Sequence, residues 1–252
     1  MRGTFTAFVY SAPEYIIAQL AYWIGRRTRG PLDPSVQLQY NIVQSSTLGL
    51  IALVLGFSFS VAAARYDSRR GLLADEVNAI GTSYLRSALL NSTDEGRYRE
   101  TLREYTAQRI RYYASPSDWD RDPRNEAHLD ALEAKLFAIA ATNENRHPQN
   151  LGVSLLLQST NTLFDIAGRQ RTAVRARAPA VILLLLFLAA GIGAALIGFA
   201  LGSAGARSIF IVFSFAVVVT LVVDTVVDLD RPEGGTIRLD FAPLQAQLNV
   251  MH

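Results

Sequence analysis

The sequence contains no cysteine, and only one of its 24 basic residues, Lys135, is a lysine. Without cysteine, the chain can form neither a disulfide nor a thiolate metal site. Its three histidines (His128, His147 and His252) lie far apart, and none has a partner at metal-ligand spacing. A phosphate-binding glycine loop, a nucleophile elbow and an HExxH pattern are also absent. We therefore expect no metal, no cofactor and no enzyme activity.

Charge is also scarce. The formal net charge of the 252 residues is only +2, so nothing indicates a nucleic-acid partner. Half of the residues are hydrophobic and the mean hydropathy is +0.18. This composition is too apolar for an ordinary soluble domain, and it predicts a protein of the lipid bilayer.

Three long apolar runs account for this composition. A helix needs roughly 20 apolar residues to cross a membrane. Residues 180–201 meet this requirement without a charge, and residues 208–227 meet it with Asp224 as the one exception. The six residues between them allow only a tight turn, so the two runs are expected to form a transmembrane hairpin. Residues 47–64 form another span, which Arg65 closes.

The first apolar segment, residues 5–24, is less regular because it contains Pro13, Glu14 and Gln19. It fits a helix that crosses the membrane, one that lies in the interface, or one that packs behind other helices. We favour a span or re-entrant helix, so the sequence predicts three to four transmembrane helices.

Basic residues near the span ends indicate the orientation, since they collect on the cytoplasmic side. The hydrophilic segment between the second and third spans begins and ends with arginines, at positions 65, 69, 70, 169, 171, 175 and 177. These arginines, which form the majority, place the large segment and the C-terminus in the cytoplasm. Arg207 and the cluster Arg26, Arg27 and Arg29 lie on the opposite side and argue against this orientation.

The hydrophilic segment shows helical periodicity. We expect the second span to continue as a helix to about residue 91, a helix after an N-cap at residues 91–94, a loop at 115–125, and helices at 128–143 and 151–177. The chain then divides into an N-terminal membrane segment with the second span (1–65), a helical cytoplasmic insert (66–177), the hairpin (178–231) and a cytoplasmic tail (232–252).

Charged residues mark the end of the last span. Asp224, Asp228 and Arg231 follow an i, i+4, i+7 pattern, so a continuous helix places them on one stripe. Ionisable groups at this depth should face protein or water and not lipid. The stripe is either a charged vestibule or a structural junction between the span and the cytoplasmic helices, and we favour the junction.

Three stretches carry a resemblance to a known family. They are residues 48–86, the hairpin, and the closing DLDRPEGGTIRL at residues 228–239. Together they resemble the bestrophin-like domain family of bacterial membrane proteins. A more distant similarity extends to the bestrophins, pentameric ion channels with four spans per subunit. The apolar run ending in Leu55-Gly56-Phe57 and the exit Arg65-Tyr66-Asp67 carry this similarity.

The resemblance implies pore-lining residues on the second span. In bestrophins the phenylalanine of Leu-Gly-Phe, and the residues four and eight positions before it, form a hydrophobic neck; here these are Phe57, Leu53 and Gly49. Because Gly49 replaces a bulky residue of the bestrophin neck, the pore is expected either to be wider at that level or to have its constriction at Phe57 and Val61. A tryptophan pair that follows the bestrophin second span is missing, and Asp228, Asp230 and Glu233 only weakly match an acidic calcium clasp.

The sequence therefore predicts an all-α, polytopic, bestrophin-like membrane protein of the bacterial inner membrane. The expected function is a channel for inorganic ions. The resemblance implies a homo-oligomer, and a pentamer like that of the bestrophins is the expected form. The alternative is a non-conducting scaffold or accessory subunit that binds a partner through its cytoplasmic helices.

Overall fold

The computed structural model describes residues 2–27, 34–176, 180–205, 208–230 and 237–251, which fall into two compact units. The first, here called the membrane unit, comprises Met1–Arg65 and Arg177–Arg231. The second, here called the helical unit, comprises Tyr66–Ala176 and Pro232–His252. The four-segment division predicted from the sequence concerns membrane and cytoplasm, so it stays a prediction.

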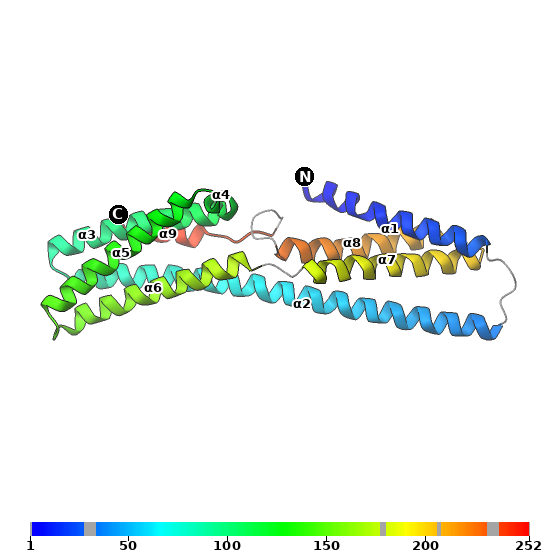
Figure 1. Cartoon of the computed structure of the whole chain (residues 1–252), viewed down its shortest axis with the longest axis horizontal. Helices are drawn as coiled ribbons and strands as arrows, with labels where there is room; N and C mark the ends of the chain where they lie inside the picture. Colours follow the sequence, from blue (N-terminus) through cyan, green and yellow to red (C-terminus); the bar gives the residue numbers. More distant parts are fainter. Residues whose placement is uncertain (1, 28–33, 177–179, 206–207, 231–236, 252) are drawn as a thin grey trace. The chain divides into compact units, whose positions relative to one another are not determined.

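Every regular element in the described ranges is helical (Figure 1). The membrane unit contains α1 (Arg2–Arg27), the first part of α2 (Pro34–Arg86), α7 (Ala180–Ser203) and α8 (Ile209–Asp230). The helical unit contains the rest of α2, a 3-10 turn (Ser87–Leu89), α3 (Ser92–Ala114), α4 (Pro116–Asp120), α5 (Pro123–Arg146), α6 (Leu151–Arg175) and α9 (Ala242–Val250). The all-α prediction is confirmed.

The three predicted spans are also confirmed, since parts of α2, α7 and α8 are long and apolar enough to cross a membrane. α2 begins much earlier than the predicted span, at Pro34 and not at residue 47. No proline or glycine interrupts residues 35–48, and Pro34 is suited to the first turn of a helix. α1 is not among the three candidate spans.

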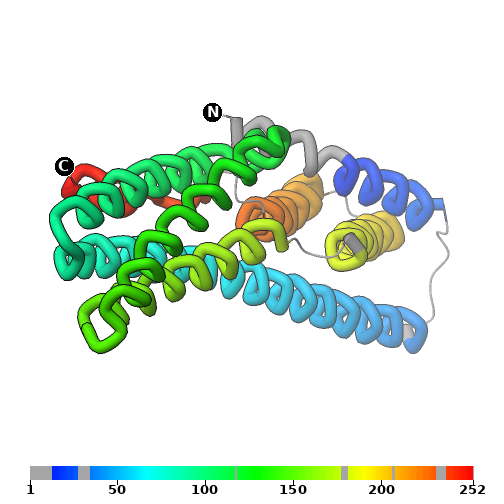
Figure 2. The backbone as a smooth tube through the Cα atoms, turned by 60° about the vertical axis from the view of Figure 1, so that its left-hand side comes forward, coloured from blue at the N-terminus to red at the C-terminus, as the bar shows by residue number. Residues whose placement is uncertain are grey.

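In the membrane unit, α1 runs beside α7 in the same direction (Figures 1 and 2). Small residues allow the close approach: a Cβ atom added to Gly198 would collide with the carbonyl oxygen of Ala18, and one added to Gly202 with that of Tyr22. Gly25 makes the reciprocal contact, on Phe199 of α7. Glycine at such contacts lets two backbones touch within a membrane.

α2 contacts the rest of the membrane unit through side chains. The Tyr40 hydroxyl donates a hydrogen bond of 3.1 Å to the carbonyl oxygen of Leu196 on α7, and its ring lies 5.5 Å from that of Phe199. Ile51 and Leu55, further along α2, are buried. These contacts orient α2, and no helix that the structure describes covers its opposite face, where Leu53 and Phe57 are exposed.

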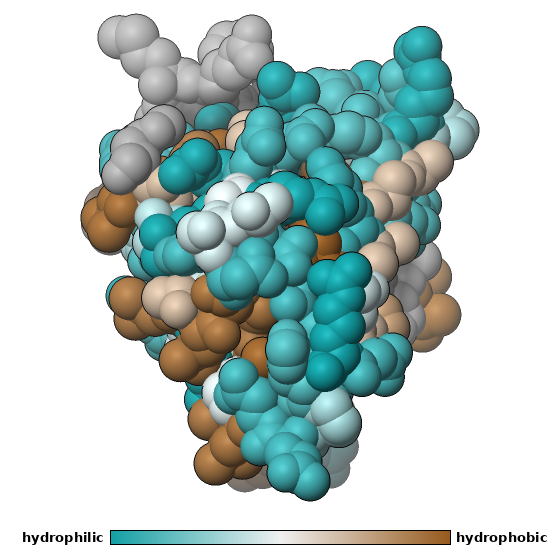
Figure 3. Space-filling model, turned by 90° about the vertical axis from the view of Figure 1, so that its left-hand side faces the viewer, coloured by the Kyte–Doolittle hydropathy of each residue, from teal (hydrophilic) through white to brown (hydrophobic). Residues whose placement is uncertain are grey.

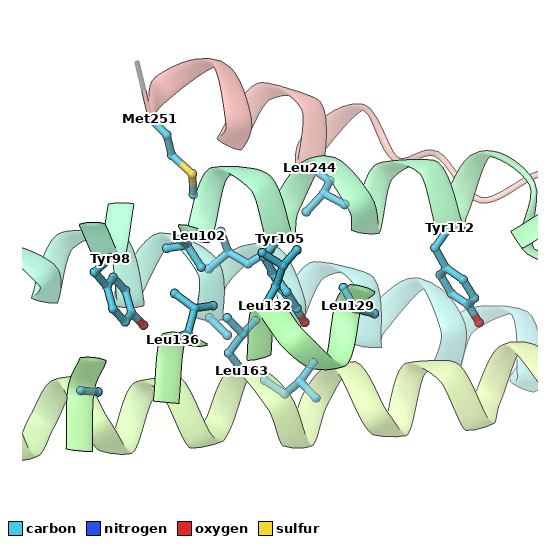
Figure 4. Close-up of a cluster of buried hydrophobic side chains, with 14 of the residues drawn as sticks. Tyr98, Leu102, Tyr105, Tyr112, Leu129, Leu132, Leu136, Leu163, Leu244 and Met251 are labelled. Carbon is cyan, nitrogen blue, oxygen red and sulfur yellow. The ribbon is translucent and has the colours of Figure 1, made fainter. Parts of the chain in front are cut away.

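The helical unit has an apolar core built from α2, α3, α5, α6 and the C-terminal segment (Figure 4). Tyr98, Leu102 and Tyr105 of α3, together with Leu136 of α5, are fully buried in it. Leu244 of α9 and Met251 complete this core. α9 was not predicted from the sequence, because its nine residues are too few for a clear periodicity.

The predicted loop at residues 115–125 was wrong in part. It contains α4 and the start of α5, because Pro116 and Pro123 each occupy the first turn of a helix. The Asp122 side chain caps α5 by accepting a 3.1 Å hydrogen bond from the backbone N–H of Arg124. By contrast, the predicted cap of α3 is confirmed, since Asn91 Oδ1 accepts from the Asp94 N–H at 2.9 Å.

Candidate pore-lining face and charged junction

Two faces of α2 differ sharply in the membrane unit. Ile51, Leu55 and Ala62 point towards the rest of the chain and are buried. On other sides of the helix, Leu53 is 54% exposed, Phe57 64% and Val61 49%. A Cβ atom added to Gly49 would meet nothing within 4 Å. The four residues predicted to line a pore therefore form one stripe along α2 that this chain leaves open, since residues four apart share a helix face.

One apolar hollow, of about 630 Å³, lies between α2 and α8. Phe59 of α2 and Phe215 of α8 contribute the aromatic part of its wall. The remaining lining residues are Leu48, Ile51, Ala52, Leu55, Gly56, Val218, Val219, Leu221, Val222 and Thr225. Thr225 supplies the only side-chain hydroxyl in this lining, so the hollow suits an apolar occupant.

A second hollow, of about 270 Å³, lies between α2, α7 and α8. Phe57 and Val61 line it, together with apolar side chains of α7 such as Leu183. Gly49 and Leu53 line neither of these two hollows. Phe57 thus lies at the boundary between the open stripe and the second hollow.

An ion pair joins α2 to the last residue of α8. Arg65 Nη1 of α2 donates to Asp230 Oδ1 at 3.0 Å, and the Asp230 side chain is only 8% exposed. The pairing of these two residues is not predictable from the sequence, because the register between two distant helices has no local signal. The pair binds α2 to α8.

The predicted charged stripe is only partly described. Asp224 and Asp228 lie on α8 with intermediate exposure, and Arg231 lies outside the described residues. Asp224 forms no ion pair with any residue that the structure describes. The role of the stripe as junction or vestibule stays a prediction.

A second polar contact joins α1 to α8. The Thr220 hydroxyl donates a 3.0 Å hydrogen bond to Glu14 Oε2, and Glu14 is buried. The polar residue that made the first apolar segment look irregular therefore has a partner inside the protein. This contact satisfies a group that would be costly in lipid.

The helical unit contains a buried ion pair that sequence reasoning missed. Arg109 of α3 donates two hydrogen bonds to Glu76 of α2, and both side chains are fully buried. The Tyr113 hydroxyl donates to the same carboxylate at 2.5 Å. Burial alone would lower the pKa of Arg109, but the Glu76 carboxylate outweighs this and keeps that pKa well above its usual value.

Aromatic rings enclose this pair. The Arg109 guanidinium lies 4.9 Å from the centre of the Tyr112 ring, at cation–π distance. Burial raises the pKa of Tyr112 to about 12. No group of three or more His, Asp or Glu side chains that could hold a metal occurs in the described ranges. The absence of a metal and of a cofactor nevertheless stays a prediction.

Three apolar helices of spanning length, joined to an all-helical hydrophilic unit, define a helical membrane protein. The family model of the Bestrophin-like domain matches residues 15–244, so the chain belongs to the bestrophin-like domain family. No curated protein matches the sequence.

Solved structures share the fold. A crystal structure of a bacterial bestrophin homologue from Klebsiella pneumoniae superimposes with a TM-score of 0.63 at 15% identity, covering 94% of each chain. The structure of a mutant bacterial bestrophin homologue from the same organism superimposes with a TM-score of 0.66 at 15% identity, covering 98% of this chain and 94% of that one. A crystal structure described as a mutant membrane protein superimposes with a TM-score of 0.70 at 15% identity, covering 100% of this chain and 95% of that one. At this identity the similarity shows the fold.

Proposed function

We propose that this chain forms an oligomeric, bestrophin-like ion channel whose narrowest point lies on α2. The observation that carries the proposal is the open stripe of Gly49, Leu53, Phe57 and Val61, which the chain's own helices leave uncovered. A ring of such side chains, one set from each subunit, forms an apolar constriction that gates ion passage by dewetting.

The composition of this stripe favours a pore over a lipid-facing surface. The stripe begins at Gly49, and Ser60 and Ala64 lie beside it on the same side of α2; all three residues are exposed. The exposed surface of α8 is bulkier, with Ile209, Phe210 and Phe213 in its first turns. Small and hydroxylated residues give a water-filled path more room and polarity, whereas a lipid-facing helix gains most from bulky apolar groups.

Assembly would cover the apolar surface that α2 leaves open. We propose a homo-oligomer, with the pentamer of the bestrophins as its template, in which a neighbouring subunit fills the 630 Å³ hollow between α2 and α8. In this arrangement the Arg65–Asp230 ion pair fixes α2 against α8 and so sets the position of the stripe.

The acidic residues of α8 are not part of the proposed constriction. Asp224 and Asp228 lie one helical turn apart, near the end of α8. We assign them, with Arg231, to the junction at the membrane boundary. A vestibule role predicts that Asp224→Asn shifts the reversal potential of the channel, whereas a junction role predicts no shift.

We also propose that α1 crosses the membrane as a fourth span. Its backbone follows that of α7 closely at Ala18, Tyr22 and Gly25. Its buried carboxyl group, Glu14, has a hydrogen-bond partner on α8. A helix held this closely along a membrane-spanning neighbour shares the depth of that neighbour.

The proposed location is the bacterial inner membrane, with the helical unit and the C-terminus in the cytoplasm. Because the chain has no cysteine, each single substitution supplies the only thiol. Ala204, in the turn after α7, and Gln149, before α6, are both exposed. In intact spheroplasts, a membrane-impermeant maleimide should label Ala204→Cys at once and Gln149→Cys only after permeabilisation. The reverse pattern would overturn the orientation.

Ion flux through purified, reconstituted protein tests the channel directly. Phe57→Ala removes a 64% exposed ring from the proposed constriction, and we expect flux to rise roughly tenfold, which equals a barrier lower by about 1.4 kcal/mol. Phe210→Ala is the matched control, since this ring on α8 is 78% exposed but lies outside the stripe.

Tight vesicles with both the unchanged protein and Phe57→Ala would refute conduction. That result would favour the alternative, a membrane scaffold that binds a partner through the helical unit. Equal increases for Phe57→Ala and Phe210→Ala would place the constriction elsewhere.

A further inference from the structure

The helical unit contains a polar pocket that the channel proposal does not use. Its volume is about 170 Å³, and it lies between the first turns of α3 and one face of α5. Its lining residues are Asp94, Arg97, Lys135, Ala138, Ile139, Thr142, Asn143 and Arg146. The side of the molecule seen in Figure 3 is mainly hydrophilic. The side chains of Arg97 and Arg146 are each 61% exposed, so a water-soluble ligand can reach the pocket.

One carboxylate in the pocket is already satisfied by neutral groups. Asp94 Oδ2 accepts hydrogen bonds from the side-chain amides of Asn91 at 2.8 Å and Asn143 at 3.1 Å. Asp94 and Asn143 are both buried. These bonds fix the wall of the pocket and hold the pKa of the Asp94 carboxyl below its usual value.

Three cations line the pocket, and two of them, Arg97 and Arg146, lie near the Asp94 carboxylate at long distance. Arg97 Nη1 is 3.5 Å from Asp94 Oδ1, and Arg146 Nη1 is 3.8 Å from Asp94 Oδ2. Such long contacts leave most guanidinium N–H groups free to donate elsewhere. Lys135, the chain's only lysine, forms no ion pair with any described residue. The pocket therefore carries more positive than negative charge.

We propose that this pocket binds a small phosphate-type anion. Two guanidinium groups, an ammonium group and the Thr142 hydroxyl supply donors from several directions, which suits a tetrahedral anion with several acceptor oxygens. No aromatic side chain lines the pocket, so it lacks a platform for a nucleotide base. The same chemistry would accept free phosphate or the phosphomonoester headgroup of a lipid. The proposal is independent of ion conduction.

The single lysine makes the test specific. Reductive methylation of the full-length protein in detergent with ¹³C-formaldehyde labels Lys135 and the N-terminal amine, which serves as an internal reference. Titration with inorganic phosphate or pyrophosphate should shift the Lys135 signal to saturation and leave the N-terminal signal in place. Potassium chloride at matched ionic strength should produce no saturable shift.

Two variants connect the shift to this pocket. Arg146→Gln should weaken phosphate binding about tenfold, since charged hydrogen bonds dominate such sites. Arg121→Gln should leave binding unchanged, because Arg121 is exposed, pairs with Asp118 and does not line the pocket.

Micelles containing phosphatidic acid form the second arm of the experiment. If soluble phosphate saturates the shift of the Lys135 signal, the ligand of the pocket is a free anion; if only these micelles saturate it, the ligand is a lipid headgroup. A Lys135 shift that does not saturate with either ligand would overturn the proposal. Equal movement of both amine signals, or an affinity that Arg146→Gln leaves unchanged, would do the same.

Discussion

Removing Arg109 should destabilise the helical unit severely, because it leaves Glu76 buried without its cation. Arg109 and Glu76 side chains are both 0% exposed, and Tyr113 would be the only remaining described donor to the carboxylate. We choose Arg109→Met, which keeps an unbranched side chain in the core but removes the charge and the hydrogen bonds.

The size of the effect follows from this burial. Breaking one partner of a buried ion pair costs about 3–5 kcal/mol, against a total domain stability of about 5–15 kcal/mol. For a chain of this length, the expected fall in the unfolding midpoint is roughly 6–20 °C. Arg121→Met is the control, since the Arg121–Asp118 pair is exposed to water and its loss should leave the midpoint unchanged.

Trp119 reports on this core directly. It is buried, and its ring lies 6.1 Å from that of Tyr112, next to Arg109. In a Trp23→Phe background, Trp119 is the only tryptophan, so its emission follows unfolding of the helical unit in the full-length, detergent-solubilised protein.

The double variant Glu76→Met, Arg109→Met distinguishes the destabilisation caused by an unpaired buried charge from that caused by altered packing. It removes the uncompensated charge, so it should be clearly more stable than Arg109→Met alone. The reasoning fails if Arg109→Met melts like the Arg121→Met control, or if the double variant is less stable than both single variants.

Two further predictions concern other contacts. The hydrogen bonds from Asn91 and Asn143 hold the pKa of Asp94 below its usual value of 3.8, so its contribution to stability is present above about pH 4 and is lost as the pH falls through the folded-state pKa. Unfolding midpoints measured between about pH 5 and about pH 2 should fall less steeply for Asp94→Asn, and parallel slopes would contradict this. Gly198→Ala drives a methyl group into the backbone of Ala18 and should cost about 1–3 kcal/mol. A methyl group at Gly96, which is exposed on α3, meets nothing within 4 Å, so Gly96→Ala should not lower the unfolding midpoint. Equal midpoints for the two variants would refute the close α1–α7 contact.

Features that depend on a single helix were predictable from the sequence. The charge-free run of α7 and the apolar run of α8 defined two spans, because hydrocarbon thickness sets their length. The cap at Asn91 and the continuation of α2 beyond residue 65 were also found, since both are local patterns.

Features that depend on register between distant helices were not predictable. The Arg65–Asp230 pair joins residues 165 positions apart, and Glu14–Thr220 joins residues 206 apart. Glu76 and Arg109 each look like an ordinary polar residue of an amphipathic helix until α2 and α3 are packed together. The open stripe around Phe57 came from a family resemblance, since an apolar helix has no periodicity that distinguishes pore from lipid.

The most direct test of the account is an electron cryomicroscopy structure of the purified full-length particle. It should show a ring of identical subunits around a central pathway, with Leu53, Phe57 and Val61 of every copy facing the axis and the narrowest point at Phe57. A single subunit, a central axis filled by side chains from other elements, or a Phe57 ring turned towards lipid would contradict the proposed channel.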